Sequence, residues 1–516
     1  MRLKNTITNS IVNIITIMLG FLPSFIVRKS FLNSLGEELL GLSSVYGNII
    51  GVLSIVELGI GSAIIFSLYR PFAEDNKEKI KGYLEYYGIF YKIVGFIILI
   101  LGLLTTIILP IFIKDEINML DARFYFILFL INTFITYMFS HKLCILNVAQ
   151  EGYKISIGTS ISKIIIATIQ LISLKIYPSF YLYLVIQILI NLIYYAVMNS
   201  YISRRYLWLK DTKGFINKEE RKQLSRNVKA LFIHKIGGMI VFGVDNLVIS
   251  SFINLKIVGI YNSYNMIIGA FQTVISSALS GVTASIGNLL TEDDPDKAYE
   301  VHKRLFFISF WIVSFTTISL SNTIKQFTIL WLGDNQILDT FTVTILLINL
   351  YFILMRGSVE RFKEGAGIYH EDRFAPIFES LINLITSIIL VNIIGLPGVF
   401  LGTLISNLSV VFWVKPKIVY KYVFNRNISE YFKMYLKYLI IGLLPLIITH
   451  ILTINLRNNI DIISFLLNCV VNIVVINVIY VIVLKNSEEF KYFNNIISNL
   501  LKKKINNIKE IRLEKN

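Results

Sequence analysis

The sequence is poor in charge and in the residue types that build metal and disulfide sites. Only 16% of its 516 residues are charged, against about 25% in an ordinary soluble domain. Its two cysteines, Cys144 and Cys469, lie in apolar stretches, so no disulfide framework or thiolate zinc site is available. The shortage of charge, together with 55% apolar residues, excludes a disordered chain and argues against a soluble enzyme.

Signatures of catalysis are also missing. The sequence contains no nucleophile triad, no P-loop and no H-E-x-x-H pair among its five histidines. Asp294-Pro295-Asp296 matches the D-x-D of metal-dependent sugar transferases by spacing, but Asp followed by Pro is also how a helix begins. We therefore expect a helix cap there, no cofactor, and a protein that is not an enzyme.

Long apolar runs dominate the sequence instead. A membrane-spanning helix needs roughly 20 mostly apolar residues, and backbone groups in hydrocarbon must hydrogen-bond within their own segment. The sequence therefore predicts an all-α, polytopic membrane protein with fourteen transmembrane helices. These cover Ile7–Val27, Val45–Tyr69, Gly88–Ile113, Phe124–Leu146, Ile155–Tyr177, Ser179–Ile202, Ala230–Ile253, Ile257–Gly287, Leu305–Ile324, Ile337–Met355, Phe374–Ile394, Gly398–Val414, Tyr438–Asn455 and Ile460–Leu484.

The basic excess orients this bundle. Lys and Arg number 49 against 33 Asp and Glu, a formal net charge of +16. With both termini in the cytosol, most of the 49 basic residues fall on the inside and few fall outside. This asymmetry follows the positive-inside rule. It accounts for the charge without a nucleic-acid partner.

An internal repeat divides the chain. A shift of 218 residues pairs Gly41 with Gly259 and Tyr46 with Tyr264. Because six helices separate the copies, both have the same orientation, which is typical of a parallel repeat with the ligand between two halves. We expect an N-lobe of six helices over 1–213, a C-lobe of six over 214–437, a helix pair over 438–484, and a basic amphipathic cytosolic tail over 485–516. The tail either lies on the anionic inner leaflet or is solvated.

Ionisable residues at membrane depth are candidates for function, because burying them is costly. Glu57 is predicted near the middle of the second helix, and Asp245, followed by Asn246, lies in the seventh. Arg28 ends the first helix, where it either snorkels to headgroups or faces a cavity. Arg356 and Glu360 are four residues apart, so they form either a structural ion pair or part of a ligand site.

Several stretches carry a family resemblance. These are Leu39-Leu40-Gly41-Leu42 with Glu57-Leu58-Gly59-Ile60-Gly61-Ser62-Ala63, Asp245-Asn246-Leu247-Val248-Ile249-Ser250, Gly287-Asn288-Leu289 and Gly367-Ile368-Tyr369-His370-Glu371-Asp372-Arg373. In this order they resemble the polysaccharide-export branch of the MOP superfamily, with the Wzx-like O-antigen and capsular polysaccharide flippases most similar. The superfamily also holds multidrug extruders (MATE) and lipid II flippases.

The resemblance implies a MATE-like pair of pseudo-symmetric lobes in the bacterial plasma (inner) membrane. The cargo would be an undecaprenyl-diphosphate-linked oligosaccharide that crosses by alternating access, with H⁺ or Na⁺ as a coupling ion and a polysaccharide polymerase or assembly protein as a further partner. Arg28 and Arg356 would offset the phosphate charge, while Glu57 and Asp245 would bind a cation or sugar hydroxyls. Lipid II flippases gather several arginines on helices 1, 2 and 8, which this chain does not, so lipid II is a less favoured cargo.

Two alternatives remain open. A cation-coupled multidrug or toxin extruder of the same superfamily would use Asp245 or Glu57 for coupling. A membrane glycosyltransferase or polymerase would favour a large outer loop, which the predicted topology lacks.

Overall fold

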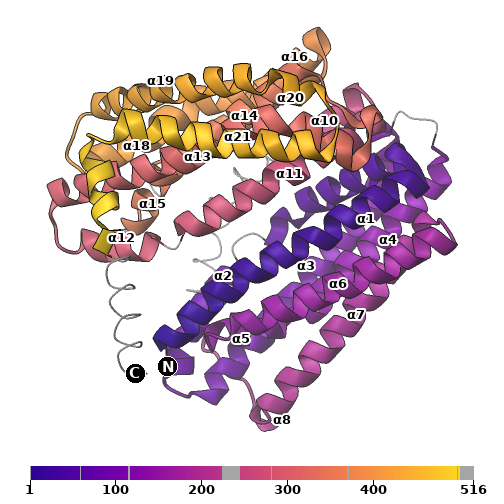
Figure 1. Ribbon diagram of the computed structural model, residues 1–516. Coiled ribbons are helices and arrows are strands. Elements are labelled where there is room, and N and C mark those ends of the chain that lie inside the picture. Colours follow the sequence, from indigo (N-terminus) through magenta and orange to yellow (C-terminus); the bar gives the residue numbers. More distant parts are fainter. Residues whose placement is uncertain are drawn as a thin grey trace, which may run out of the picture. The chain divides into compact units, whose positions relative to one another are not determined.

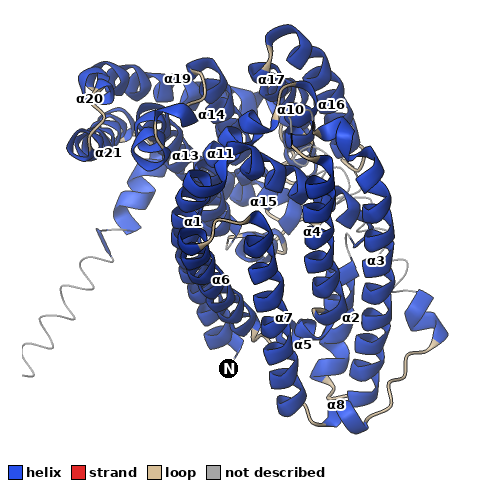
Figure 2. Ribbon diagram, turned by 90° about the vertical axis from the view of Figure 1, so that its right-hand side faces the viewer, coloured by secondary structure: helices blue, strands red, loops and turns tan. Residues whose placement is uncertain are grey.

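The computed structural model describes residues 2–57, 60–113, 117–222, 244–280, 282–368, 371–496 and 498–499. Within these residues the chain forms helices and no strand (Figure 2). Ten helices of this described part are long and apolar enough to cross a membrane. The all-α, multi-pass fold class is thus confirmed, and the count of fourteen spans stays a prediction. Residues 230–243 of the predicted seventh helix and 500–516 of the tail lie outside the described residues.

The chain divides into two compact units. Unit 1 comprises residues 1–270 and 373–411, and unit 2 comprises residues 271–372 and 412–516. The boundaries therefore cut the sequence at places other than the predicted lobe ends, and the lobes stay a prediction.

Unit 1 is built from the helices of the first half of the chain and three later ones (Figure 1). They are α1 (Arg2–Leu53), η1 (Ser54–Glu57), α2 (Ile60–Ala73), α3 (Lys77–Phe112), α4 (Met119–Phe139), η2 (His141–Leu143), α5 (Cys144–Val148), α6 (Gly152–Ile176), α7 (Phe180–Arg205), α8 (Trp208–Asp211), α10 (Asp245–Phe252), the first part of α11 (Leu255–Ser280), α16 (Ala375–Ile394), α17 (Leu396–Ser406) and the π-helix η4 (Asn407–Val411).

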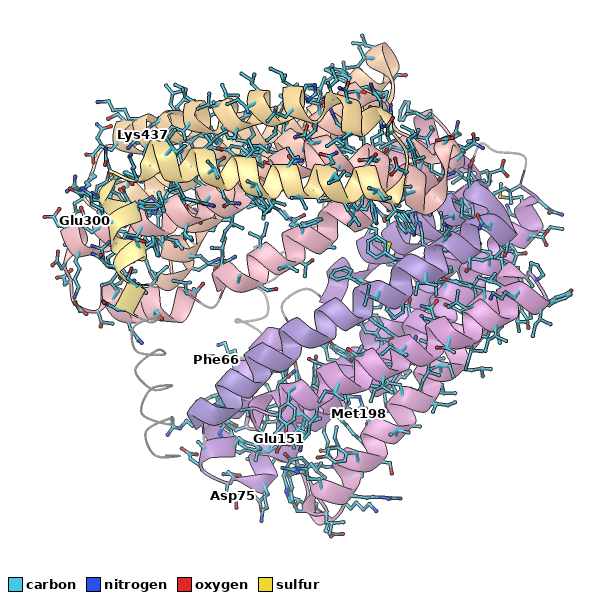
Figure 3. The ribbon with its side chains drawn as sticks, in the orientation of Figure 1. Phe66, Asp75, Glu151, Met198, Glu300 and Lys437 are labelled. Carbon is cyan, nitrogen blue, oxygen red and sulfur yellow. The ribbon has the colours of Figure 1, made fainter. Side chains whose placement is uncertain are left out.

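Local sequence explains where several of these helices bend or begin. α1 covers the first predicted span and the start of the second, and its backbone turns between them at Gly36, whose φ of 85° suits glycine. Asn76 caps α3 by accepting a hydrogen bond from the Lys79 amide at 3.0 Å. Asp75 and Glu151, which lie in the loops before α3 and α6, are at the same end of unit 1 (Figure 3). An even number of spanning helices between them requires this placement.

Unit 2 holds the remaining helices, with α13 at its centre. They are the end of α11, α12 (Thr283–Leu290), α13 (Pro295–Leu332), η3 (Asp334–Gln336), α14 (Thr340–Met355), α15 (Gly357–Gly365), α18 (Phe412–Tyr422), α19 (Ile428–Leu452), α20 (Ile454–Asn458) and α21 (Ile462–Leu484). Asp294 caps α13 and Pro295 is its first residue, which confirms the helix cap expected in place of a sugar-transferase motif. α13 packs against α14, α19 and α21.

A buried polar network joins α13 to the last two spanning helices. The Asn322 amide donates to Thr449 at 3.0 Å and to Asn472 at 2.8 Å. Asn468 donates to the Asn322 carbonyl at 2.9 Å and to the Gln326 side chain at 3.2 Å. All five residues are at most 2% exposed. Since unsatisfied polar groups are costly in hydrocarbon, these bonds fix α19 and α21 onto α13.

The start of the predicted tail packs on unit 2. The Phe493 ring stacks on Phe307 with centroids 5.9 Å apart, and the Phe490 ring stacks on Trp311 at 6.1 Å. These contacts hold the first part of the tail against α13.

Candidate functional site

Arg28 connects α1 to α11 within unit 1. Its Nη2 donates to the Gly259 carbonyl at 2.8 Å and to the Ser263 hydroxyl at 3.0 Å, and its Nε donates to the same hydroxyl at 3.2 Å. Both partners are neutral, so the guanidinium is bound without a counter-charge from the described residues. The Arg28 guanidinium therefore contacts a neighbouring helix of the protein rather than lipid headgroups.

The same two helices approach closely at a pair of glycines. A Cβ at Gly41 would lie 1.9 Å from the Leu255 carbonyl oxygen, and a Cβ at Gly259 would lie 2.7 Å from the Glu37 carbonyl oxygen. Beside this crossing, Lys256 pairs with Glu37 at 2.9 Å. Gly41 and Gly259 are equivalent positions of the 218-residue repeat, so the structure brings two repeat-related residues against each other.

Asp245 is the first residue of α10. Its Oδ1 atom is buried and accepts no hydrogen bond from the part of the chain that the structure describes. A buried carboxylate oxygen without a donor is unfavourable. This oxygen can therefore take up a proton or a monovalent cation.

α10 packs against α1, α3, α16 and α17, and buried polar groups join α16 to α17. The Asn383 amide donates to Thr403 Oγ1 at 2.9 Å, and Ser387 Oγ donates to the Val399 carbonyl at 2.9 Å. The two donor residues are each 1% exposed. Oxygen ligands of the type that alkali cations prefer thus lie on two of the helices that contact α10.

Asn246 differs from its neighbour because its side chain is satisfied by other asparagines. Its Nδ2 donates to Asn48 at 3.1 Å, and its Oδ1 accepts from Asn262 at 2.9 Å. These residues come from α10, α1 and α11, and Asn246 is 6% exposed. The arrangement indicates an interhelical contact for Asn246.

Glu57 lies at a break in the second predicted helix. The chain leaves the α-helix at Leu53 and forms the 3₁₀ turn η1 up to Glu57, so this residue is not at the middle of a continuous helix. One carboxylate oxygen accepts the hydroxyl of Tyr91, and the other accepts the hydroxyl of Tyr137 at 2.5 Å. The tyrosines are 6% and 4% exposed. Short 3₁₀ stretches within a helix often mark functional positions.

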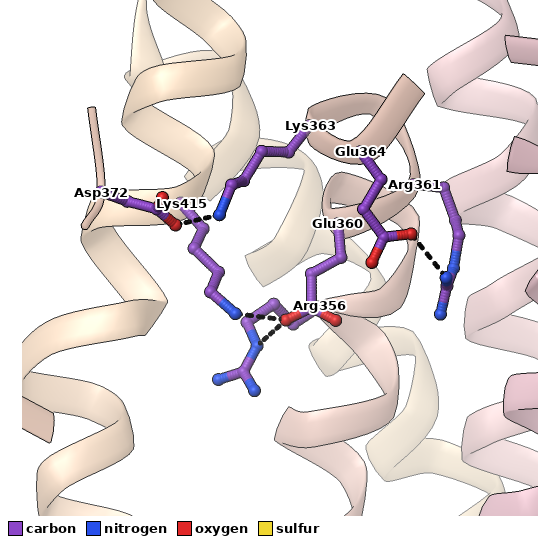
Figure 4. Close-up of polar contacts among 7 residues, drawn as sticks. All are labelled: Arg356, Glu360, Arg361, Lys363, Glu364, Asp372 and Lys415. Atoms are coloured by element: carbon purple, nitrogen blue, oxygen red, sulfur yellow. Dashed lines mark hydrogen bonds and ion pairs between the residues drawn. The ribbon is translucent and has the colours of Figure 1, made fainter. Parts of the chain in front are cut away.

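Arg356 and Glu360 form the ion pair that their spacing predicts, and a third residue joins them (Figure 4). Arg356 lies at the turn between α14 and α15, and its Nε donates to Glu360 Oε1 at 2.9 Å. Lys415 of α18 donates to the same oxygen at 2.5 Å. The three side chains, which we call the triad, are 10%, 24% and 16% exposed. One carboxylate thus holds two cations inside unit 2.

Tyrosines of α19 lie beside the triad. The rings of Tyr431 and Tyr435 both contact Phe412, three residues before Lys415, and the Tyr435 ring also stacks on Phe352, four residues before Arg356. Tyr435 is 5% exposed, and its buried hydroxyl has no hydrogen-bond partner among the described residues. A phenol in that state can donate to an anion bound at the triad.

An apolar cavity lies next to these tyrosines. Its volume is about 330 Å³, and it is lined by α13, α14 and α19. Phe352, one of its lining residues, stacks on Tyr435 with ring centroids 6.0 Å apart. Unit 2 therefore combines a charged site with an adjacent apolar space.

The sequence predicted some residues of the triad and of the Glu57 site, but not their partners from other helices. It identified Arg356, Glu360 and Glu57, but it missed Lys415, Tyr91 and Tyr137, which are far away in sequence. The signal that could have found the tyrosines is their position within strongly apolar helices, where a phenol needs a partner. Whether these residues contact a substrate stays a prediction.

Comparison with known proteins identifies the family of this chain. The family described as "Polysaccharide biosynthesis protein" matches residues 3–284, more than half of the chain. None of the curated proteins matches the chain.

Three solved structures have similar folds. The lipid II flippase MurJ in an inward closed conformation has a TM-score of 0.70 and 14% identity, over 93% of this chain and 99% of that chain. An inward-facing multidrug resistance MATE family transporter of the MOP superfamily has a TM-score of 0.62 and 16% identity, over 78% and 95%. A MOP superfamily transporter from Pyrococcus furiosus has a TM-score of 0.53 and 16% identity, over 78% and 92%. The chain therefore belongs to the polysaccharide biosynthesis protein family, and it has the fold of MOP superfamily flippases and transporters.

Proposed function

We propose that this protein is a flippase that moves an undecaprenyl-diphosphate-linked oligosaccharide from the inner to the outer leaflet of the bacterial plasma membrane. The observation that carries the proposal is the triad, in which Arg356 and Lys415 share the carboxylate of Glu360 inside a membrane-spanning unit. Ionisable groups within helices that are long and apolar enough to span a membrane are often functional. A diphosphate is an anion that they can bind.

The depth of the triad suits a lipid headgroup. Arg356 lies nine residues before the end of the span Thr340–Gly365, and Lys415 lies seven residues before the end of Leu396–Tyr422. At 1.5 Å per residue these positions are about 14 Å and about 10 Å from the helix ends. In the predicted topology both ends are cytosolic, and the two residues directly follow the predicted spans that end at Met355 and Val414. The cations would then meet the diphosphate of a lipid that still resides in the inner leaflet.

The surroundings of the triad suit a molecule that is polar at one end and apolar at the other. The apolar cavity shares Phe352, which lies one helical turn before Arg356, with the ring cluster around Tyr435. A polyprenyl chain would remain against apolar surface or lipid, while its diphosphate contacts the cations. This combination supports a lipid-linked substrate over a wholly soluble one.

Coupling to H⁺ or Na⁺ is part of the proposal. The buried Asp245 Oδ1, which has no donor among the described residues, is the proposed ion-binding group. Glu57 is a second one, because its carboxylate is held only by the phenols of Tyr91 and Tyr137 within that same part of the chain. Uptake of a cation at either carboxylate would change the local charge and so favour one conformation of the transporter over another.

Loss of the gene tests the function. Deletion should leave the lipid-linked glycan on the cytosolic leaflet, and a polymerase acting at the outer face would lack its substrate. Complementation with Arg356→Gln should restore outer-leaflet glycan poorly, whereas Arg361→Gln, which changes an arginine paired with Glu364 on the same helix, should restore it. Normal outer-leaflet glycan in the deletion strain would refute the proposal.

A multidrug or toxin extruder is the second candidate, because MATE transporters share the fold and because Asp245 could bind an organic cation. The same deletion strain separates the two functions. Accumulation of cationic dye with normal glycan export would favour the extruder.

A further inference from the structure

Glu360 occupies a position in the triad that an anionic ligand would need. Its Oε1 accepts from both Arg356 Nε and Lys415 Nζ, so the two cations are already held together by one carboxylate. Resting on the proposed flippase function, we infer that Glu360 is an internal counter-ion that the substrate's diphosphate displaces. The triad then exchanges a protein anion for a substrate anion during transport.

Lys415 has unused capacity for such an exchange. An ammonium has three N–H donors, and among the described residues Lys415 gives one of them, to Glu360. The triad side chains also remain partly exposed, at 10% to 24%, so a ligand can reach them. Lys415 can therefore bind a phosphate oxygen without first losing a full set of partners.

Tyr435 supplies an independent sign that a ligand belongs here. Its ring packs against Phe352 and Phe412, which precede Arg356 and Lys415 by about one helical turn; it is 95% buried, and its hydroxyl has no partner within the described chain. A buried hydroxyl normally has a partner. A phosphate oxygen bound to Arg356 would provide the acceptor.

Neighbouring ion pairs show that the triad is unlike an ordinary structural pair. Lys363 pairs with Asp372, and Arg361 pairs with Glu364 at 2.7 Å (Figure 4). In each of these pairs, one cation contacts one carboxylate oxygen. In the triad, two cations contact the same carboxylate oxygen, and a diphosphate could offer each of them a separate oxygen.

The competition between Glu360 and diphosphate also explains how the substrate could leave. A site without Glu360 would keep a diphosphate bound by two cations in a poorly hydrated place. With Glu360 present, its carboxylate forms its hydrogen bonds to Arg356 and Lys415 again as the diphosphate departs. Transport needs binding that is strong enough for entry and weak enough for release.

The test measures binding of inorganic diphosphate to the full-length protein in detergent, by calorimetry. Glu360→Gln keeps an acceptor but removes the competing charge, so it should bind diphosphate at least about tenfold more tightly than the unaltered protein. Lys415→Gln should bind it at least about tenfold more weakly, and Lys415→Arg should restore binding. Glu364→Gln, the matched control, should stay within about twofold.

Either of two results would overturn the inference: no binding of diphosphate to the unaltered protein, or a Glu360→Gln variant that binds no more tightly. Thermal unfolding of each variant identifies those that fail to fold, and Lys415→Arg retains the charge where Lys415→Gln does not fold. Leaflet exposure of the glycan in cells is measured separately. If Glu360→Gln does not tighten diphosphate binding while deletion of the gene does abolish glycan export, the inference alone is rejected. If the variants bind diphosphate as expected but deletion leaves glycan export normal, the flippase function is rejected.

Discussion

The close crossing of α1 and α11 makes a sharp prediction about Gly41. In Gly41→Ala the new Cβ would lie 1.9 Å from the Leu255 carbonyl oxygen, whereas an ordinary contact is about 3.4 Å or longer. The helices must then separate by about 1.5 Å at this point. The three nearest atoms all belong to the Leu255 backbone, so no side-chain rotation can relieve the clash. Such overpacking costs about 1–3 kcal/mol.

Gly47 provides a control on the same helix. A Cβ at Gly47 meets nothing within 4 Å, as does one at Gly269 on α11. Replacing glycine by alanine in an open helical position stabilises by roughly 0.5–1 kcal/mol. Gly41→Ala should therefore unfold more easily than Gly47→Ala by roughly 1.5–4 kcal/mol.

The measurement is the free energy of unfolding in mixed detergent micelles, from a denaturing-detergent titration of each purified variant. A separation of 1.5 Å would also stretch the 2.8 Å bond from Arg28 to the Gly259 carbonyl, so Arg28→Gln should lose less stability in the Gly41→Ala background than in the unaltered protein. If Gly41→Ala were as stable as Gly47→Ala, the helices would not pack as described.

Three further predictions concern other contacts. Asn472→Leu breaks buried hydrogen bonds within α21 and to α13, so we expect a loss of about 1–2 kcal/mol in the same titration, without loss of membrane insertion. Tyr137→Phe removes a hydrogen bond to the Glu57 carboxylate, and glycan export in the complemented deletion strain should fall about tenfold or more. The hydrogen bond from Lys79 of α3 lowers the pKa of Glu220, so this contact between α3 and residues 217–222 is fully present above pH 4.5 and is lost as pH falls through the lowered pKa. Reduced protection of residues 217–222 from hydrogen exchange at acid pH would show the loss. A Glu220→Gln variant should lack this pH dependence.

The fold could be predicted because the membrane leaves few choices. Apolar length identifies helices, and charge orients them. The helix ends were harder to predict: α13 extends over Pro295–Leu332, beyond the predicted Leu305–Ile324, because the helix continues through polar residues that flank the apolar stretch. The break at Ser54–Glu57 was not predicted either, since that stretch contains no proline.

The sites could be predicted only where partners are close in sequence. Arg356 and Glu360 are four residues apart on one helical path, so their pairing follows from helix geometry. Lys415 lies 55 residues from Glu360, and Tyr137 lies 80 residues from Glu57. Such contacts depend on which helices become neighbours, and hydropathy carries no information about that.

The polar network of unit 2 has a consequence for synthesis. Asn468 hydrogen-bonds to Asn322, which precedes it by 146 residues. At a translation rate of 5–20 residues per second, α21 emerges roughly 7–30 s after α13. During that interval the amides of Asn322 and Gln326 are in the bilayer without their final partners, which favours retention of α13 at the insertion machinery until α21 arrives. A ribosome that stalls before residue 468 would therefore leave an inserted but incompletely assembled chain, and such a chain should be a target for membrane proteases.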